Sequence, residues 1–188
     1  ELEYQIEYYV PQKFESANGE ILTMRELAKQ IKISKGDFFT IYGKPASGKS
    51  TAMRKLYCIL WKTHKCVYFQ MKNIRNLEHL KECLGHQKKD SNLKDRERVI
   101  AFFDGVDEAI PFWNGEDFFS IFLNGTDAKI FSVFEDCGLV ADNMIFGMRP
   151  EFLKHSVSDL KLAKENFTMI NLEIMRMSDK DICNVFRS

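Results

Sequence analysis

One short stretch of the chain has the residue types of a phosphate-binding loop. Residues 43–51 read GKPASGKST, with two glycines that permit a tight turn whose backbone N–H groups face inward onto phosphate oxygens. In such a loop Lys49 would neutralise the β- and γ-phosphates, and the Ser50 hydroxyl would ligate Mg²⁺. We therefore predict a nucleotide site formed by Gly43, Lys44, Pro45, Ala46, Ser47, Gly48, Lys49, Ser50 and Thr51, the last reaching the α-phosphate.

A second stretch, RVIAFFDGVDEA at 98–109, could supply the metal and acid–base chemistry. Asp104 follows an apolar run and would hold Mg²⁺ opposite Ser50, as the aspartate after a buried strand does in many nucleotide hydrolases. Asp107 and Glu108 come three and four residues later, and either acid could orient or deprotonate an attacking water. The alternative is that both acids only solvate a loop or complement a helix N-terminus.

A third stretch, NMIFGMRP at 143–150, reads as a strand that ends in an arginine. Arg149 would lie near the γ-phosphate, where it could stabilise charge or report that the phosphate is bound. The competing interpretation is a surface cation that precedes a turn-forming proline. Lys49, Asp107, Glu108 and Arg149 are therefore the predicted catalytic residues, and Ser50 and Asp104 the predicted metal ligands.

The elements that flank the loop suit this role. The short apolar run at 37–43 predicts a buried strand leading into the loop, and apolar residues at helical spacing predict a helix from Lys49 to about residue 62. Upstream, Thr23 and Glu26 have the spacing of a capping box, which predicts a helix over about 22–32 that Gly36 ends.

The rest of the chain alternates between strand and helix patterns. Strands are predicted at 66–71, 99–103, 143–148 and 167–175. Leucines 77, 80 and 84 predict a helix stopped by Gly85, and the charged stretch 86–98 reads as a surface loop. Two helices are predicted over 112–134, and a last one opens at Ser178. This alternation predicts an α/β fold with a parallel sheet covered by helices on both faces.

Composition excludes several function classes. The 188 residues carry 27 basic and 27 acidic side chains, so the chain lacks the overall basic charge of many nucleic-acid binders. Five widely spaced cysteines suit a reducing cytosol, and neither they nor the histidines have zinc-site spacing. No apolar run is long enough to span a membrane, and residues 1–10 lack the basic and apolar regions that would predict a signal peptide. We expect a cytoplasmic piece of a longer chain, with no membrane partner and no direct nucleic-acid binding.

The three motifs together resemble the NACHT group of STAND-class P-loop NTPases. Gly43–Thr51 matches the phosphate loop of that group, 104–108 is similar to its DGxDE pattern, and Arg149-Pro150 is similar to the end of its sensor strand. Met148 departs from the group, which usually has a small hydroxylated residue there. The segments 8–15 and 170–186 resemble the stretches that frame a NACHT core, so the likeness spans nearly the whole chain.

The resemblance implies more than the residues alone. It implies a three-layer α/β/α P-loop NTPase with a five-stranded parallel sheet in the order 5-1-4-3-2, whose strand ends hold the nucleotide. Residues 1–20 would be an N-terminal extension, and 21–188 the core, truncated before any helical lid and sensor repeats. ATP and ADP would be the ligands and Mg²⁺ the cofactor. The full-length protein would self-associate in defence or cell-death signalling, with slow turnover by this piece alone.

Two other functions remain open at this point. Gly105 in place of an acid next to Asp104, and Met148 before Arg149, favour a nucleotide-binding interaction module with negligible hydrolysis. A third function is another P-loop enzyme, such as a small-molecule kinase or a DNA-linked ATPase. Such a kinase needs a basic lid over the phosphates, and the only candidate, 86–98, comes before Asp104, where most such lids do not occur.

Overall fold

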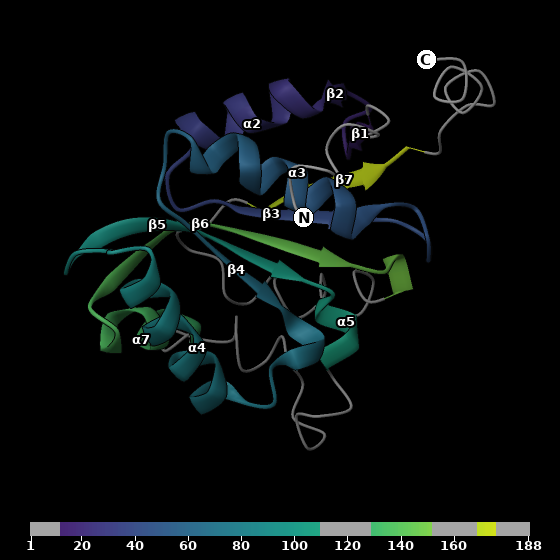
Figure 1. Ribbon diagram of the computed structural model, residues 1–188. Coiled ribbons are helices and arrows are strands. Elements are labelled where there is room, and N and C mark those ends of the chain that lie inside the picture. The colour runs from purple at the N-terminus through teal and green to yellow at the C-terminus, as the bar shows by residue number, and fades with distance from the viewer. Residues whose placement is uncertain (1–11, 110–128, 152–168, 176–188) are drawn as a thin grey trace, which may run out of the picture.

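A seven-stranded sheet with helices on both faces forms the core of the computed structural model (Figure 1). The structure describes residues 12–109, 129–151 and 169–175. Residues 1–11 of the predicted N-terminal extension, most of the helical span 112–134 and the predicted helix at Ser178 lie outside these residues. The strands are β1 (Lys13–Ser16), β2 (Ile21–Thr23), β3 (Phe38–Tyr42), β4 (Cys66–Gln70), β5 (Glu97–Asp104), β6 (Leu139–Met148) and β7 (Met169–Ile174).

The sheet corrects the predicted five-stranded, wholly parallel arrangement. It is mixed and mostly parallel, with the order β2-β1-β7-β3-β6-β5-β4. Neighbouring strands from β7 to β4 run parallel, and this part keeps the relative order predicted for five strands. Strands β1 and β2 extend the sheet beyond β7, each antiparallel to its neighbour. The fold is α/β, and its complete strand order differs from the prediction because of these two strands.

Packing explains why the first two strands join the sheet. Phe14 on β1 lies opposite both Leu22 on β2 and Ile174 on β7, and its side chain is fully buried. Each strand is only three or four residues long, too short for a clear alternating pattern in the sequence. The hairpin is therefore stabilised by the apolar surface that Phe14 buries in the sheet rather than by local propensity.

One face of the sheet is covered by helices α2 (Met24–Ile33) and α3 (Lys49–Trp61), as Figure 1 shows. The predicted capping box is confirmed, since the Thr23 side chain accepts from the Glu26 N–H and the Glu26 side chain accepts from the Thr23 N–H. The apolar side chains of both helices pack onto Phe39, Phe102 and other residues of this face. This packing holds the start of α3, and with it the glycine loop, against the sheet.

The opposite face is covered by α4 (Leu77–Asp90) and α7 (Lys129–Asp136) (Figure 1). The prediction that Gly85 ends this helix is wrong, because α4 continues through Gly85 to Asp90. A glycine inside a helix costs about 1 kcal/mol. Burial of Leu80 and Leu84 and the Asn76 N-cap, which accepts from the His79 N–H, offset that cost.

The stretch 86–98 is consequently not the single loop that was predicted. Its first five residues belong to α4, and its last two begin β5. Gln87 on α4 donates through Nε2 to the Tyr68 carbonyl at 3.0 Å and accepts from the Tyr68 N–H at 2.9 Å. Tyr68 lies on β4, the last strand of the sheet, so Gln87 satisfies backbone groups that the edge would otherwise leave open.

A buried asparagine joins the sheet to the end of α2. Asn143 on β6 is 1% exposed, and its Nδ2 donates to the carbonyls of Ile31 at 2.8 Å and Ser34 at 3.2 Å. Its Oδ1 accepts from the Asp37 N–H at 3.0 Å, just before β3 begins. One amide therefore sets where the chain enters the strand that leads to the glycine loop.

Replacing this asparagine should destabilise the whole domain. We expect Asn143→Ala to lower the free energy of unfolding by about 2–4 kcal/mol, because three backbone groups, one buried and two partly buried, lose their partner. Urea unfolding followed by circular dichroism measures the change. Asn73→Ala, at an exposed asparagine, should cost about 0.5 kcal/mol or less. Equal losses in both variants would contradict the role given to Asn143.

Candidate functional site

The three sequence motifs meet at the carboxyl ends of neighbouring parallel strands. Tyr42, the residue before the glycine loop, lies opposite Met148, the residue before Arg149. Asp104 at the end of β5 lies opposite Gly147 on β6. The register therefore brings the loop, the aspartate and the arginine to one edge of the sheet, where open α/β sheets bind ligands.

The glycine loop links the end of β3 to the start of α3, as predicted. Gly48 precedes the helix with φ of +87°, a left-handed conformation that favours glycine. A Cβ atom built on Gly43 would lie 2.7 Å from the Ser47 Oγ, so a side chain here would displace the Ser47 hydroxyl. The N-terminus of α3 adds the positive end of its dipole to the backbone N–H groups of the loop.

Lys49, the first residue of α3, turns its side chain back over the loop. Its Nζ donates to the Gly43 carbonyl at 2.7 Å and to the Lys44 carbonyl at 3.0 Å. Burial lowers the pKa of Lys49, while neighbouring carboxylates, Asp107 foremost, act to raise it. The ammonium group is thus held beside the loop and within the field of the acidic residues.

Asp104 is 7% exposed, and both of its carboxylate oxygens accept hydrogen bonds. The Ser50 hydroxyl donates to Oδ1 at 3.0 Å, and the Tyr68 hydroxyl donates to Oδ2 at 2.8 Å. Burial, followed by the nearby Asp104 carboxylate, raises the pKa of Tyr68, so its hydroxyl keeps the proton that it donates. These bonds hold the carboxylate in a single orientation toward Ser50.

Ser50 and Asp104 together fit a Mg²⁺ ion. A hydroxyl and a carboxylate are the hard oxygen donors that this cation prefers, and these two lie within hydrogen-bond distance of each other. Within the described ranges, no cluster of three or more His, Cys, Asp or Glu residues could hold a metal. An ion here would therefore take its remaining ligands from water and phosphate oxygens, as Mg²⁺ commonly does.

The two acids after Asp104 differ in their surroundings. The Asp107 side chain is 4% exposed, and its Oδ2 accepts from the Arg149 Nε at 2.8 Å. Arg149 keeps half of its side chain exposed, and Glu108 is exposed as well. Asp107 therefore orients Arg149, while Glu108 keeps a carboxylate that is accessible to water.

A hollow of about 440 Å³ unites nearly all of the predicted site residues. Gly43 and Lys44 do not line it, although their carbonyls accept from Lys49 at its edge. The residues that line it are Pro45, Ala46, Ser47, Gly48, Lys49, Ser50, Thr51, Asp104, Gly105, Asp107, Glu108 and Arg149. The three motifs thus form a single concave surface that carries two cations and three carboxylates.

Two residues of this region were not identified from the sequence. Tyr68 on β4 donates to Asp104 on the neighbouring strand β5, and Gln12 donates through Nε2 to the Ser47 carbonyl at 3.0 Å. Neither residue belongs to a recognisable pattern. A strand tyrosine and a glutamine before a short strand are common, so no signal in the sequence could have selected them.

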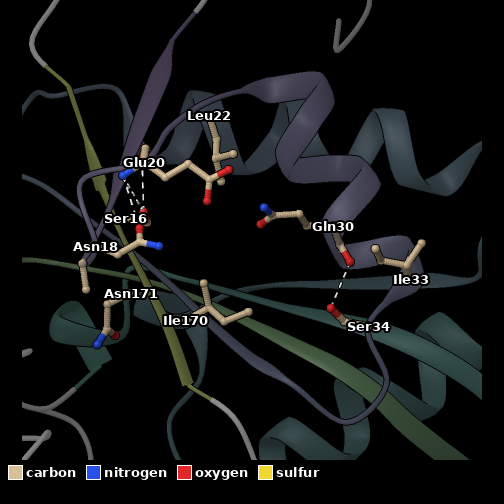
Figure 2. A pocket seen from close by; sticks show the side chains of 10 residues that line it. Ser16, Asn18, Glu20, Leu22, Gln30, Ile33, Ser34, Ile170 and Asn171 are labelled. Atoms are coloured by element: carbon tan, nitrogen blue, oxygen red, sulfur yellow. Dashed lines mark hydrogen bonds between the residues drawn. The ribbon is translucent and has the colours of Figure 1, made fainter.

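A second hollow of about 400 Å³ lies between the β1–β2 hairpin, α2 and β7 (Figure 2). Among the described residues that line it, Glu20 is the only charged one, and Ile33 and Ile170 supply apolar surface beside Gln30 and Ser34. It contains none of the predicted site residues. The candidate site is therefore the hollow at the glycine loop.

No protein-family model and no curated protein matches the chain. The chain is similar to the ORC1 protein of Aeropyrum pernix in complex with DNA, at 14% identity and a TM-score of 0.47, over 87% of this chain and 47% of that one. It is also similar to Drosophila ORC bound to DNA, at 8% identity and a TM-score of 0.38, over 88% of this chain and 31% of that one. The chain thus spans less than half the length of either structure.

These comparisons correct one expectation about partners. The prediction of no direct nucleic-acid binding is contradicted, because both similar structures are complexes with DNA. With respect to membranes, none of the helices that the structure describes has the length and apolar character needed to cross a bilayer.

Proposed function

We propose that this chain binds ATP and ADP with Mg²⁺ and hydrolyses ATP at the bond between the β- and γ-phosphates. The observation that carries the proposal is the hollow lined jointly by the glycine loop, Asp104 to Glu108 and Arg149. Backbone N–H groups at a helix N-terminus, a lysine, a serine–aspartate pair and an arginine are the groups that phosphoryl transfer needs, because its catalysis depends mostly on position and charge.

Each group has one role in the proposed reaction. The loop N–H groups and Lys49 hold the phosphates, and Ser50 and Asp104 would hold Mg²⁺, which neutralises charge on the phosphate oxygens when bound. Glu108, exposed at the rim of the hollow, orients the attacking water. Arg149, held by Asp107, stabilises the charge that develops on the transferred phosphoryl group.

More specifically, we propose that the domain is the core of a NACHT-type STAND switch, in which the bound nucleotide controls self-association in defence or cell-death signalling. The support is the order of the three sequence motifs, above all the DGVDE stretch at 104–108, in which a glycine follows the aspartate and two acids come later. A switch of this kind should bind ADP tightly and turn over slowly.

Calorimetry on the intact chain tests the proposal. ATP, ADP and GTP are titrated with and without Mg²⁺, and an adenine preference with tight, Mg²⁺-dependent ADP binding is the expected result. If none of the three nucleotides binds to this chain or to a longer one that contains it, the proposal is wrong.

Separate substitutions of the two acids test the catalytic assignments. We expect Glu108→Gln to lower ATP turnover by about 100-fold, because the water loses its orienting carboxylate. Asp107→Asn should lower it by about 10-fold, because Arg149 loses its charged partner. Phosphate release under saturating ATP measures both, and ADP affinity should stay within about threefold of wild type.

A nucleotide-binding module without hydrolysis is the second candidate. It is favoured by the ion pair between Asp107 and Arg149, which engages one acid and the arginine with each other. Negligible ATP turnover by the wild-type protein, together with tight ADP binding, would favour this module over the hydrolase. Measurable turnover that is unchanged in both variants would mean only that the two acids are not catalytic.

A further inference from the structure

Gln12 contacts the glycine loop from outside the hollow. It is 4% exposed, and its Nε2 donates to the Ser47 carbonyl at 3.0 Å. Ser47 and Gly48 line the hollow, whereas Gln12 does not. The glutamine therefore acts on the loop backbone and has no direct access to a ligand in the hollow.

The sheet holds Gln12 in place. The next residue, Lys13, accepts from the Met175 N–H at 3.0 Å, and Phe14 pairs with Ile174 on β7. Phe14 is fully buried, so the backbone beside Gln12 is anchored in the core. An anchored side chain can impose an orientation on the loop, because it does not follow the movements of the loop itself.

The hydrogen bond sets the direction of a peptide group. In a trans peptide the C=O and N–H point in opposite directions, and the bond between Ser47 and Gly48 is trans. Because Gln12 holds the Ser47 carbonyl on the outer side, the Gly48 N–H is directed to the other side, toward the hollow. That N–H precedes α3 and lies where the helix dipole is most positive.

Gly48 also leaves room for the Gln12 side chain. Its φ of +87° is one reason for glycine at this position, and the space that Gln12 occupies is another. A Cβ atom at Gly48 would overlap the amide nitrogen of Gln12. The loop conformation and the glutamine are thus sterically matched.

We propose that Gln12 is a positioning residue, which fixes the peptide between Ser47 and Gly48 so that the Gly48 N–H donates to a phosphate of the bound nucleotide. The proposal rests on the nucleotide binding proposed above and adds a residue that lies outside the three motifs. It also links the docking of β1 to phosphate binding, because Gln12 immediately precedes that strand.

Gln12→Met tests this role, since methionine keeps the length and apolar stem of glutamine but cannot donate. We expect the Kd for ADP with Mg²⁺ to rise about 10-fold, the effect of one misdirected hydrogen bond to a charged group. Gln12→Glu, which also lacks the donor and adds negative charge, should weaken binding at least as much. Gln30→Met makes the same change in the second hollow (Figure 2), and its Kd for ADP should stay within about twofold of wild type.

The NMR signal of the Gly48 amide proton distinguishes a positioning role of Gln12 from a general destabilisation of the fold. In the wild-type protein, saturating ADP should move the Gly48 amide proton downfield, as expected for donation to phosphate. In Gln12→Met at saturating ADP, this shift should fall to about half or less, while amides of α4 keep their positions. A merely structural role would not change this resonance selectively.

The outcomes distinguish this inference from the function on which it rests. If wild-type protein binds ADP and Lys49→Ala does not, but Gln12→Met retains the wild-type Kd and Gly48 shift, the inference is wrong and the proposed function stands. If wild-type protein binds no nucleotide, both are overturned. A raised Kd together with a reduced Gly48 shift supports the inference.

Discussion

Replacing Lys49 with alanine is expected to weaken the binding of ATP and ADP by about 100-fold, which corresponds to about 3 kcal/mol. Its ammonium group lies on the loop, bound to the carbonyls of Gly43 and Lys44, and Lys49 lines the hollow that phosphates would enter. Removing it leaves the charge of the phosphates to be balanced by backbone dipoles, Mg²⁺ and the more exposed Arg149. Calorimetric titration of both nucleotides in the presence of Mg²⁺ measures the loss.

Two further variants show whether charge or folding causes the effect. Lys49→Gln keeps a donor near the two carbonyls but removes the charge, so it should bind nucleotide nearly as weakly as the alanine variant. Lys62→Ala removes an exposed lysine at the opposite end of α3 and should leave affinity within about twofold. Wild-type affinity in Lys49→Gln would mean that the lysine only supports the loop.

Asp104→Asn is expected to lower Mg²⁺-dependent ATP hydrolysis by about 100-fold to 1000-fold. Asparagine has nearly the same size but carries no charge, and its amide nitrogen cannot accept from a hydroxyl. One of the two donors, Ser50 or Tyr68, therefore loses its acceptor. Phosphate release measures the activity, and ADP titrations across a range of Mg²⁺ concentrations measure how far nucleotide affinity still depends on the metal.

The metal dependence is the informative readout for this variant. We expect Mg²⁺ to improve ADP affinity in wild-type protein and to have a much smaller effect in Asp104→Asn, with a stability loss of only about 1–3 kcal/mol. Asp136→Asn, at a half-exposed aspartate paired with Lys81, should behave like wild type. If Mg²⁺ improved ADP affinity as much in Asp104→Asn as in wild type, Asp104 would not be a ligand of the metal.

Strands β1 and β2 and helix α4 show that packing can override the local sequence pattern. Helix α4 continues through Gly85 because Leu80 and Leu84 are buried. Helix propensities of single residues do not include this burial, so they place the helix end at the glycine. Strands β1 and β2 exist because Phe14 finds a buried position beside β7. In both cases the deciding energy comes from apolar surface supplied by segments distant in the chain.

The sequence by itself determined those features of the protein that depend on contiguous residues. Gly43 to Thr51 form one local turn between a buried strand and an amphipathic helix, so spacing and residue type were sufficient to predict the loop and its position. The same holds for the capping box of α2 and for the parallel strands β3 to β7, whose existence follows from apolar runs and whose ends differ from prediction by a few residues.

Only the tertiary structure decided the contacts that give the site residues their separate roles. The hydrogen bond from Tyr68 to Asp104 joins residues 36 positions apart, and that from Gln12 to Ser47 joins residues 35 apart. The pairing of Asp107 with Arg149 likewise depends on β5 and β6 becoming neighbours. Residue types encode which side chains can donate or accept, but strand order and register decide which of them come within bonding distance.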